Sequence, residues 1–146
     1  MPAKKKIKII VDTNLFISFL IGKRLVGLKQ ALVQSNVQLI FSEQNIEELI
    51  TVTRKLKFRK YFDTNKVADL IDLIHSIGKI EKITREPEIC RDPKDNFLLA
   101  LADKGKVDYL VTGDTDLLIL KKYKNTRIIT MGKLEQLINK MSGIKL

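Results

Sequence analysis

Residues 7–14 have the sequence Ile-Lys-Ile-Ile-Val-Asp-Thr-Asn, an apolar run that ends in a carboxylate. A short run of branched apolar residues is typical of a strand buried on both faces of a parallel sheet. About a hundred residues later, the apolar run 109–111 is followed by the acidic sequence 112–116, Thr-Gly-Asp-Thr-Asp. The carboxyl ends of parallel strands meet at one edge of a sheet, and ligands bind there where the strand order reverses. We therefore expect Asp12 and Asp114 to lie at the same edge.

Strand-like and helix-like segments alternate along the rest of the chain, which predicts an α/β fold with helices covering both faces of a mostly parallel sheet. Ser42 and Asp92 are predicted helix N-caps, and Gly78 is predicted to follow a helix end. Further strands are predicted at residues 37–41, 79–83 and 127–130. Helices are predicted at residues 13–22, 25–33, 43–56, 63–77, 116–120 and 134–141, with another that begins at residue 93.

Length and composition indicate one globular domain over residues 1–146, with residues 1–6 as a basic N-terminal tail. The chain has 27 Lys and Arg against 17 Asp and Glu, and a net charge of +10 attracts polyanions such as nucleic acid. Cys90 is the only cysteine, so no intrachain disulfide can form and a cytoplasmic location is expected. No apolar run is long enough for a membrane span, so no membrane association is expected.

Acidic residues gather in the segments predicted to meet at the carboxyl edge. Each one alone has an ordinary explanation, because Asp and Glu also cap helices and favour their first turns. The residues are Asp12, Asp92, Asp95, Asp114 and Asp116, with Glu47 and Glu48 one to two turns into their helix.

Capping does not explain why these acids converge. Two carboxylates about 4 Å apart repel by roughly 4 kcal/mol at an effective dielectric constant of about 20, so a group of them needs protons or a cation. Zinc sites use histidine and cysteine, and this chain has one of each, His75 and Cys90. Mg²⁺ or Mn²⁺ is therefore favoured, and such ions promote attack of water on phosphoryl groups.

Four motifs in order resemble the PIN domain family, and they cover nearly the whole chain. They are Val11-Asp12-Thr13-Asn14, Ser42 with Glu48-Leu49, Asp92-Pro93-Lys94-Asp95-Asn96 with the apolar residues 98–102, and Val111-Thr112-Gly113-Asp114-Thr115-Asp116. The resemblance implies a three-layer α/β/α sandwich with a central, mostly parallel sheet. It also implies a Mg²⁺- or Mn²⁺-dependent ribonuclease, resembling the toxin of a toxin–antitoxin pair, with an antitoxin protein as partner and a homodimer as assembly.

The resemblance also assigns site residues. The catalytic and metal-binding acids are Asp12, Glu48, Asp95 and Asp114, with Asp116 as a further metal ligand; helical spacing alone does not distinguish Glu48 from Glu47. Hydrogen bonds that orient the carboxylates are expected from Thr13, Asn14 and Thr112.

A cluster of cations with interleaved aromatic residues is the candidate RNA-binding surface, although such charge runs are also ordinary solvated surface. It comprises Arg54, Lys55, Lys57, Arg59 and Lys60. Two other functions stay open on the sequence: a PIN-like module that binds RNA or protein with little turnover, and a receiver-like phosphoacceptor domain, which shares only the fold class and an acidic pocket.

Overall fold

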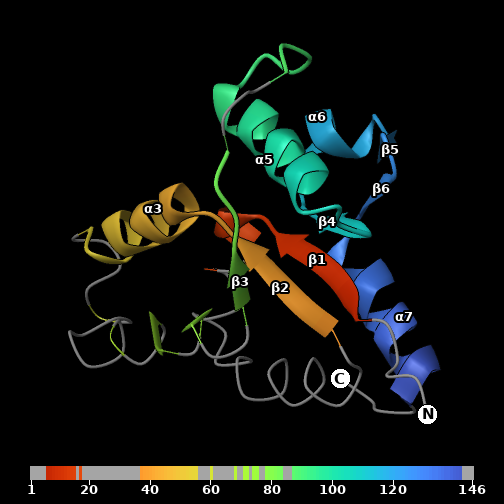
Figure 1. Ribbon diagram of the computed structural model, residues 1–146, viewed down its shortest axis with the longest axis horizontal. Coiled ribbons are helices and arrows are strands. Elements are labelled where there is room, and N and C mark those ends of the chain that lie inside the picture. Colours follow the sequence, from red (N-terminus) through yellow and green to blue (C-terminus); the bar gives the residue numbers. More distant parts are fainter. Residues whose placement is uncertain are drawn as a thin grey trace.

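A computed structural model of the chain describes residues 6–15, 17, 37–55, 60, 68, 71–72, 74–75, 78–83 and 87–142. Within these residues the protein has a six-stranded sheet in the order β3-β2-β1-β4-β6-β5 (Figure 1). All neighbouring strands are parallel except β5 and β6. The strands are β1 Ile7–Val11, β2 Val37–Phe41, β3 Gly78–Ile80, β4 Tyr109–Val111, β5 Lys122–Tyr123 and β6 Thr126–Ile129.

The strand order reverses between β1 and β4. The chain first adds β2 and β3 on one side of β1, and then returns to place β4 on its other side. Residues Ile9, Ile10 and Val11 of β1 pair with the whole of β4 in register. The carboxyl ends of these two strands therefore flank the point at which an open α/β sheet forms its ligand crevice.

Helices cover the two faces of the sheet, because consecutive strand residues point to opposite faces. Ile10 packs in a core with residues of α5 and α6, whereas Ile9 and Val11 pack in a second core with residues of α3 and α7. Figure 1 shows α5 and α6 on one side of β1 and α7 on the other. The helices are α3 Glu43–Thr53, α5 Pro93–Lys104, α6 Thr115–Leu118 and α7 Met131–Ser142. This arrangement confirms the predicted α/β fold with a central, mostly parallel sheet.

The predicted N-caps are confirmed, and both have a clear hydrogen bond. The Ser42 hydroxyl accepts from the Asn45 N–H at 3.1 Å, and the Asn45 side chain accepts from the Ser42 N–H at 3.1 Å, which completes a capping box. Asp92 caps α5 by accepting from the Lys94 N–H at 2.9 Å, and Pro93 occupies the first helical position.

Several predicted helix boundaries are wrong by a few residues. Helix α3 ends at Thr53 because the Lys55 N–H bonds to the Val52 carbonyl, three residues back, and tightens the last turn; residue 56 lies outside the described residues. Helix α6 spans Thr115–Leu118 rather than residues 116–120. Helix α7 begins before residue 134, since the Thr130 hydroxyl accepts from the Lys133 N–H at 3.2 Å near its start.

The predicted strand at residues 79–83 is shorter and shifted, because its pairing with β2 runs only from Gly78 to Ile80. The last strand is β6, one residue earlier than predicted. Residues 13–15 and 17 are helical, as are residues 68, 71–72 and 74–75. The remaining parts of the predicted helices 13–22 and 63–77, and the whole of 25–33, lie outside the described residues.

Strand β5 is absent from the sequence-based predictions. It has only two residues, too few to show an alternating pattern, and it pairs antiparallel with β6 through Lys122↔Arg127 and Tyr123↔Thr126. The turn between them has a positive φ of 51° at Lys124, where glycine or asparagine is usual.

Among the described residues, no helix has both the length and the apolar character needed to cross a membrane.

Replacement of Gly78 by alanine tests the packing between β3 and the preceding helix. A Cβ atom at this position would lie 2.6 Å from the Ile74 carbonyl oxygen and 2.8 Å from the Phe41 ring. We expect Gly78→Ala to lower the free energy of unfolding by about 1–3 kcal/mol, the usual cost of overpacking. Thermal unfolding followed by circular dichroism measures this change.

The control is Gly132→Ala in α7, where the nearest atom to the new Cβ is 3.9 Å away. This change should leave stability equal or raise it by up to about 1 kcal/mol, because alanine is the better helix former. Equal effects of the two substitutions would contradict the packing argument.

Candidate active site

Asp12 lies at the carboxyl end of β1, where three hydrogen bonds hold it in place. Its N–H donates to the Val111 carbonyl at 2.9 Å, which continues the pairing of β1 with β4. Its Oδ1 accepts from the Asn14 N–H at 3.1 Å, and its Oδ2 accepts from the Thr112 hydroxyl at 2.9 Å. The Asp12 carboxylate is therefore held in place before any ligand arrives.

Thr112 links the two strand ends through one hydroxyl group. This residue is fully buried, and its Oγ1 also accepts from the Asp114 N–H at 3.0 Å. A single side chain thus orients the Asp12 carboxylate and positions the backbone of Asp114. The geometry agrees with the orienting role expected for Thr112.

Asp114, Asp95 and Asp116 form the tightest group of acids. Each offers a carboxylate oxygen that lies within 4.8 Å of the other two. Asp95 is in the first turn of α5, and Asp114 caps α6 by accepting from the Asp116 N–H at 2.9 Å. Asp114 therefore both caps a helix and belongs to the acidic group.

Among these three acids, Asp95 is in the environment least favourable to a negative charge. Its side chain is buried, with 4% of its surface exposed, and its Oδ2 has no hydrogen-bond partner within the described part of the chain. Burial raises the pKa of Asp95 to about 7, and the hydrogen bond and negative charge of Asp114 add to the rise. A buried carboxylate with an unused oxygen costs free energy unless a proton or a cation compensates it.

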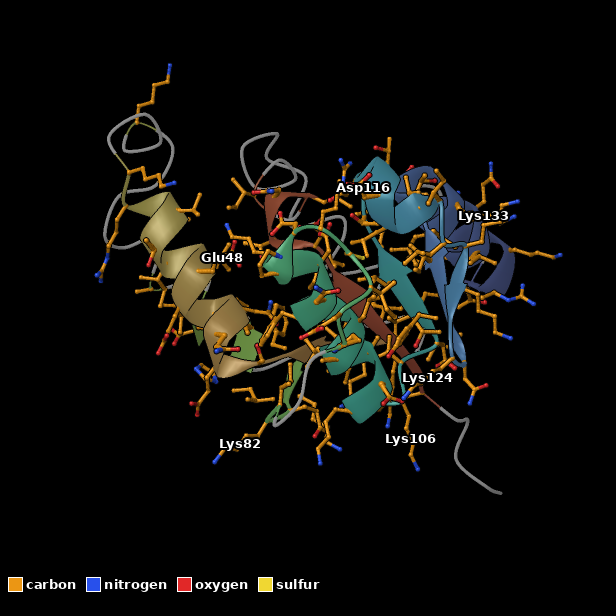
Figure 2. The ribbon with its side chains drawn as sticks, turned by 90° about the horizontal axis from the view of Figure 1, so that it is seen from above. Glu48, Lys82, Lys106, Asp116, Lys124 and Lys133 are labelled. Atoms are coloured by element: carbon orange, nitrogen blue, oxygen red, sulfur yellow. The ribbon has the colours of Figure 1, made fainter. Side chains whose placement is uncertain are left out.

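Glu48 approaches the same region from α3. Its Oε1 lies 3.2 Å from the Lys94 ammonium, and this pairing raises the pKa of Lys94. Figure 2 shows Glu48 on α3 and Asp116 at the start of α6, with the first turn of α5 between them in this view. Glu47, the alternative that helical spacing left open, is exposed and lines the same cavity.

A cavity of about 830 Å³ opens over these residues. Six of the side chains that line it are acidic: Asp12, Glu47, Glu48, Asp92, Asp95 and Asp114. Lys94 is the one cation among its described lining residues. Asp116 is not part of the lining; it is exposed and lies 3.3 Å from the Arg91 guanidinium.

Two asparagines position the elements that carry the acids. Asn45 lines the cavity and closes the capping box of α3, which fixes the start of the Glu48 helix. Asn96 is buried, and its Oδ1 accepts from the Ile89 and Cys90 N–H groups at 3.1 and 2.8 Å. Its Nδ2 donates to the Cys90 carbonyl at 3.0 Å, so Asn96 fastens the loop before α5.

The sequence alone predicts no role for Lys94, Arg91 or Asn45. One signal was present: asparagine has low helix propensity, so its occurrence in the first turn of α3 and again at the start of apolar α5 indicates a structural task. The ion pairs Lys94–Glu48 and Arg91–Asp116 carry no local sequence signal, because their partners are distant in the chain.

The other predicted residues are placed as follows. Thr13 is buried and lines the cavity, and Asn14 is exposed and lines it as well. Of the predicted RNA-binding cluster, Arg54, Lys55 and Lys60 are exposed, whereas Lys57 and Arg59 lie outside the described residues. None of the three described residues of this cluster lines the cavity.

The donor set fits a hard divalent cation. Asp95, Asp114 and Asp116 offer three converging carboxylate oxygens, and the unpartnered Oδ2 of Asp95 is a ligand atom without another use among the described residues. Carboxylate oxygen is what Mg²⁺ and Mn²⁺ prefer. The same edge also presents Asp12, Glu48 and Lys94 to a ligand in the cavity.

Comparison with known families agrees with this geometry. The PIN domain family model matches residues 8–116, and the chain belongs to this family. Members of the family are generally nucleases that use divalent metal ions, which gives the chain a nuclease-type role and its acidic cluster a metal-binding one.

Two individual proteins are similar to the chain. A protein of Methanocaldococcus jannaschii, the uncharacterized protein MJ1680, is 29% identical over 121 residues, which are 81% of this chain and 77% of the relative. The crystal structure of PAE2754 from Pyrobaculum aerophilum matches 98% of this chain and 100% of its own, with a TM-score of 0.56 and 16% identity. The second likeness supports the fold.

Substitution of Thr112 tests the link between the two strand ends. Thr112→Val keeps the shape but leaves Asp12 Oδ2 and the Asp114 N–H without their shared partner. We expect the free energy of unfolding to fall by about 1–3 kcal/mol, as for other buried polar groups that lose a partner. Thr112→Ser keeps the hydroxyl and should recover most of the loss in chemical denaturation; a serine variant as unstable as the valine variant would contradict the link.

The raised pKa of Asp95 predicts a pH dependence in EDTA. Because the folded pKa of about 7 exceeds the ordinary value of 3.8, the folded state binds this proton more tightly. The free energy of unfolding should therefore fall as pH rises from about 4 to 7, by on the order of 4 kcal/mol at most, and then level off. Urea unfolding at several pH values measures the fall.

Asp95→Asn should remove this fall and raise stability at pH 8, because the neutral amide carries no charge to bury. Asp103→Asn, on the exposed side of the same helix, is the control and should keep the fall. A wild-type profile that stays flat between about pH 4 and 7 would show that Asp95 ionises without cost.

Proposed function

We propose that the protein is a Mg²⁺- or Mn²⁺-dependent ribonuclease that hydrolyses RNA phosphodiester bonds. The observation that carries the proposal is the buried Asp95 carboxylate, which has one unpartnered oxygen and converges with Asp114 and Asp116 at the edge where the strand order reverses. An acidic pocket in a chain of net charge +10 suits a cation at the site and a polyanion across the surface.

The proposed ligands are Asp95, Asp114 and Asp116, with Asp12 beside them. A divalent ion, when bound, activates water at neutral pH and stabilises the charge that develops on a phosphoryl group. Thr112 holds the Asp12 carboxylate in one orientation, so little reorganisation is needed when the substrate arrives. With a cation bound, Asp95 would hold it as a carboxylate, since a cation nearby lowers the pKa of a carboxyl group.

Lys94 and Glu48 have a complementary role in this proposal. Their ion pair lies on the α3 side of the cavity, and the Lys94 side chain is 72% exposed. An ammonium group in this place offers a counter-charge to a phosphate that enters the cavity, while Glu48 becomes available to a metal ion or water. The predicted cluster Arg54, Lys55, Lys57, Arg59 and Lys60 remains the proposed RNA contact at the end of α3.

An antitoxin partner, a homodimer and a cytoplasmic location remain predictions.

The alternative function is a PIN-like module that binds RNA or protein with little turnover. The complete acid set favours the enzyme over the binding module, since a module has no need to keep a buried, unpartnered carboxylate oxygen such as that of Asp95.

A cleavage assay with purified protein tests the proposal. We expect single-stranded RNA to be cleaved in Mn²⁺ or Mg²⁺ and to stay intact in EDTA. Asp114→Asn should lower the cleavage rate by at least about a hundredfold, the scale of loss for a group that positions transition-state charge. Mn²⁺ should raise the Tm of the wild type by several degrees and that of Asp114→Asn by much less.

Asp72→Asn is the matched control, because Asp72 is exposed and does not line the cavity. It should retain both cleavage and the metal-dependent rise in Tm. Cleavage that survives both EDTA and Asp114→Asn would overturn the proposal. Binding of RNA without cleavage, in the presence of either metal, would establish the binding module instead.

A further inference from the structure

Exposed cations surround the β5–β6 hairpin and the C-terminal end of α5. We call them the basic hairpin surface, which comprises Lys104, Lys106, Lys122, Lys124 and Arg127. Figure 2 shows Lys106 and Lys124 close together in this view and far from Glu48 and Asp116. The sequence from residue 117 to residue 134 contains no acid, so the hairpin has no compensating charge of its own.

The Lys106 turn and the hairpin are joined by hydrogen bonds. The Thr126 hydroxyl donates to the Val107 carbonyl, and the Arg127 N–H donates to the Asp108 carbonyl at 3.0 Å. Lys124 reaches the same helix end, where its ammonium group lies 2.9 Å from Asp103. The cations therefore lie around one edge of the sheet: Lys122 and Arg127 project from the face that packs against α7, and the other three lie at the end of α5.

Two of these lysines occupy backbone positions that favour glycine. Lys106 has φ of 49° directly after the Gly105 cap of α5, and its N–H bonds to Asp103 while the Val107 N–H bonds to Ala102. This is a Schellman motif with lysine where glycine is usual. Lys124 has φ of 51° in the hairpin turn. Both positions cost backbone free energy that a glycine would avoid.

The hairpin also places like charges opposite each other. Lys122 and Arg127 are directly paired across the two strands, so their side chains project from the same face, and both are exposed. Such a pair is destabilising. The two nearby acids, Asp103 and Asp108, already accept from Lys124 and from the Lys8 N–H, respectively. An external anion is the simplest group that would offset the remaining repulsion.

We infer that the basic hairpin surface is a second binding site for the RNA backbone, which holds the strand at the end of α5 opposite the carboxylates. The choice of RNA as the ligand rests on the proposed ribonuclease function. The charges support this ligand, because lysine and arginine side chains that neutralise phosphates supply most of the affinity of sequence-independent nucleic-acid binding. Tyr123 packs against the core on the α5 face of the sheet, with the Lys124 ammonium 5.6 Å from its ring centre, and so helps to hold Lys124 in place.

The length of α5 sets the minimum length of RNA that reaches both sites. Its 12 residues span about 18 Å. A base-stacked strand advances about 3.4 Å per nucleotide and covers this distance with about five nucleotides, whereas an extended strand needs fewer. A dinucleotide that occupies the cavity cannot contact the hairpin.

Binding of a fluorescein-labelled oligouridylate of about 20 nucleotides, measured by anisotropy in EDTA, tests the inference without cleavage. The double variant Lys122→Gln/Arg127→Gln should weaken binding on the order of tenfold and reduce the slope of log affinity against log salt by about 1.4. The control Lys82→Gln/Lys133→Gln removes the same charge elsewhere, since Lys82 follows β3 at the other edge of the sheet and Lys133 lies in α7. It should leave the affinity within about twofold of the wild type and the slope unchanged.

The variant Lys106→Gly separates a loss of RNA binding from a loss of stability. It should raise Tm by about 2 °C, because glycine relieves the positive φ, and it should also weaken binding of the long oligonucleotide several-fold. In Mn²⁺, cleavage of a dinucleotide should be unaffected by any hairpin variant, because that RNA is too short to reach the hairpin.

Three results would overturn the inference. The first is an equal loss of RNA binding in the hairpin and control double variants, which would show that only net charge matters. The second is loss of binding to phosphatidylserine vesicles with no change for RNA. The third is cleavage of both RNA lengths with unchanged long-RNA binding in every hairpin variant, a result that leaves the ribonuclease proposal intact. A wild type that binds no RNA would remove both proposals.

Discussion

The repulsion between carboxylates at one sheet edge is the constraint around which the site is built. Asp95 is buried beside Asp114, and Asp12 lies at the adjoining strand end, so each negative charge makes the next one harder to hold. The protein limits this cost locally with the Thr112 hydroxyl, the helix N-termini of α5 and α6, and the Lys94 and Arg91 ammonium and guanidinium groups. What remains is seen at Asp95, whose pKa rises because the carboxyl group is buried and lies next to the charge of Asp114.

The sequence predicts the strands of this edge well because their signals are local. Residues 7–11, 37–41 and 109–111 are apolar runs bounded by polar residues, and each forms the strand expected. Asp92 followed by Pro93 defines the start of α5 for the same reason, since capping involves neighbours in the chain. Family resemblance added the choice of acids, which spacing alone could not supply.

What the sequence does not predict depends on contacts between distant residues. Asp116 was expected to be auxiliary, yet its carboxylate belongs to the tightest group because α6 begins directly over the end of β4. Glu48 was expected beside the aspartates and has a lysine as its nearest charged partner, 46 positions away along the chain. Strand β5 was missed because its two residues are ordered by pairing with β6 and by a lysine with positive φ. Such interactions have no signature in a local pattern.

The two ends of α5 differ in charge, so the molecule has an acidic side and a basic side. Acids gather at its first turn, where the helix dipole favours them; Lys104 lies in its last turn and Lys106 follows it, where the dipole favours cations. A polyanion is repelled from the first end until a cation fills the acidic group, but it is attracted to the second end at once. Since exposed charges act over about 8–10 Å at physiological salt, the two ends can hold opposite potentials without cancelling. Binding at the basic hairpin surface would therefore not depend on the metal, whereas entry into the cavity would.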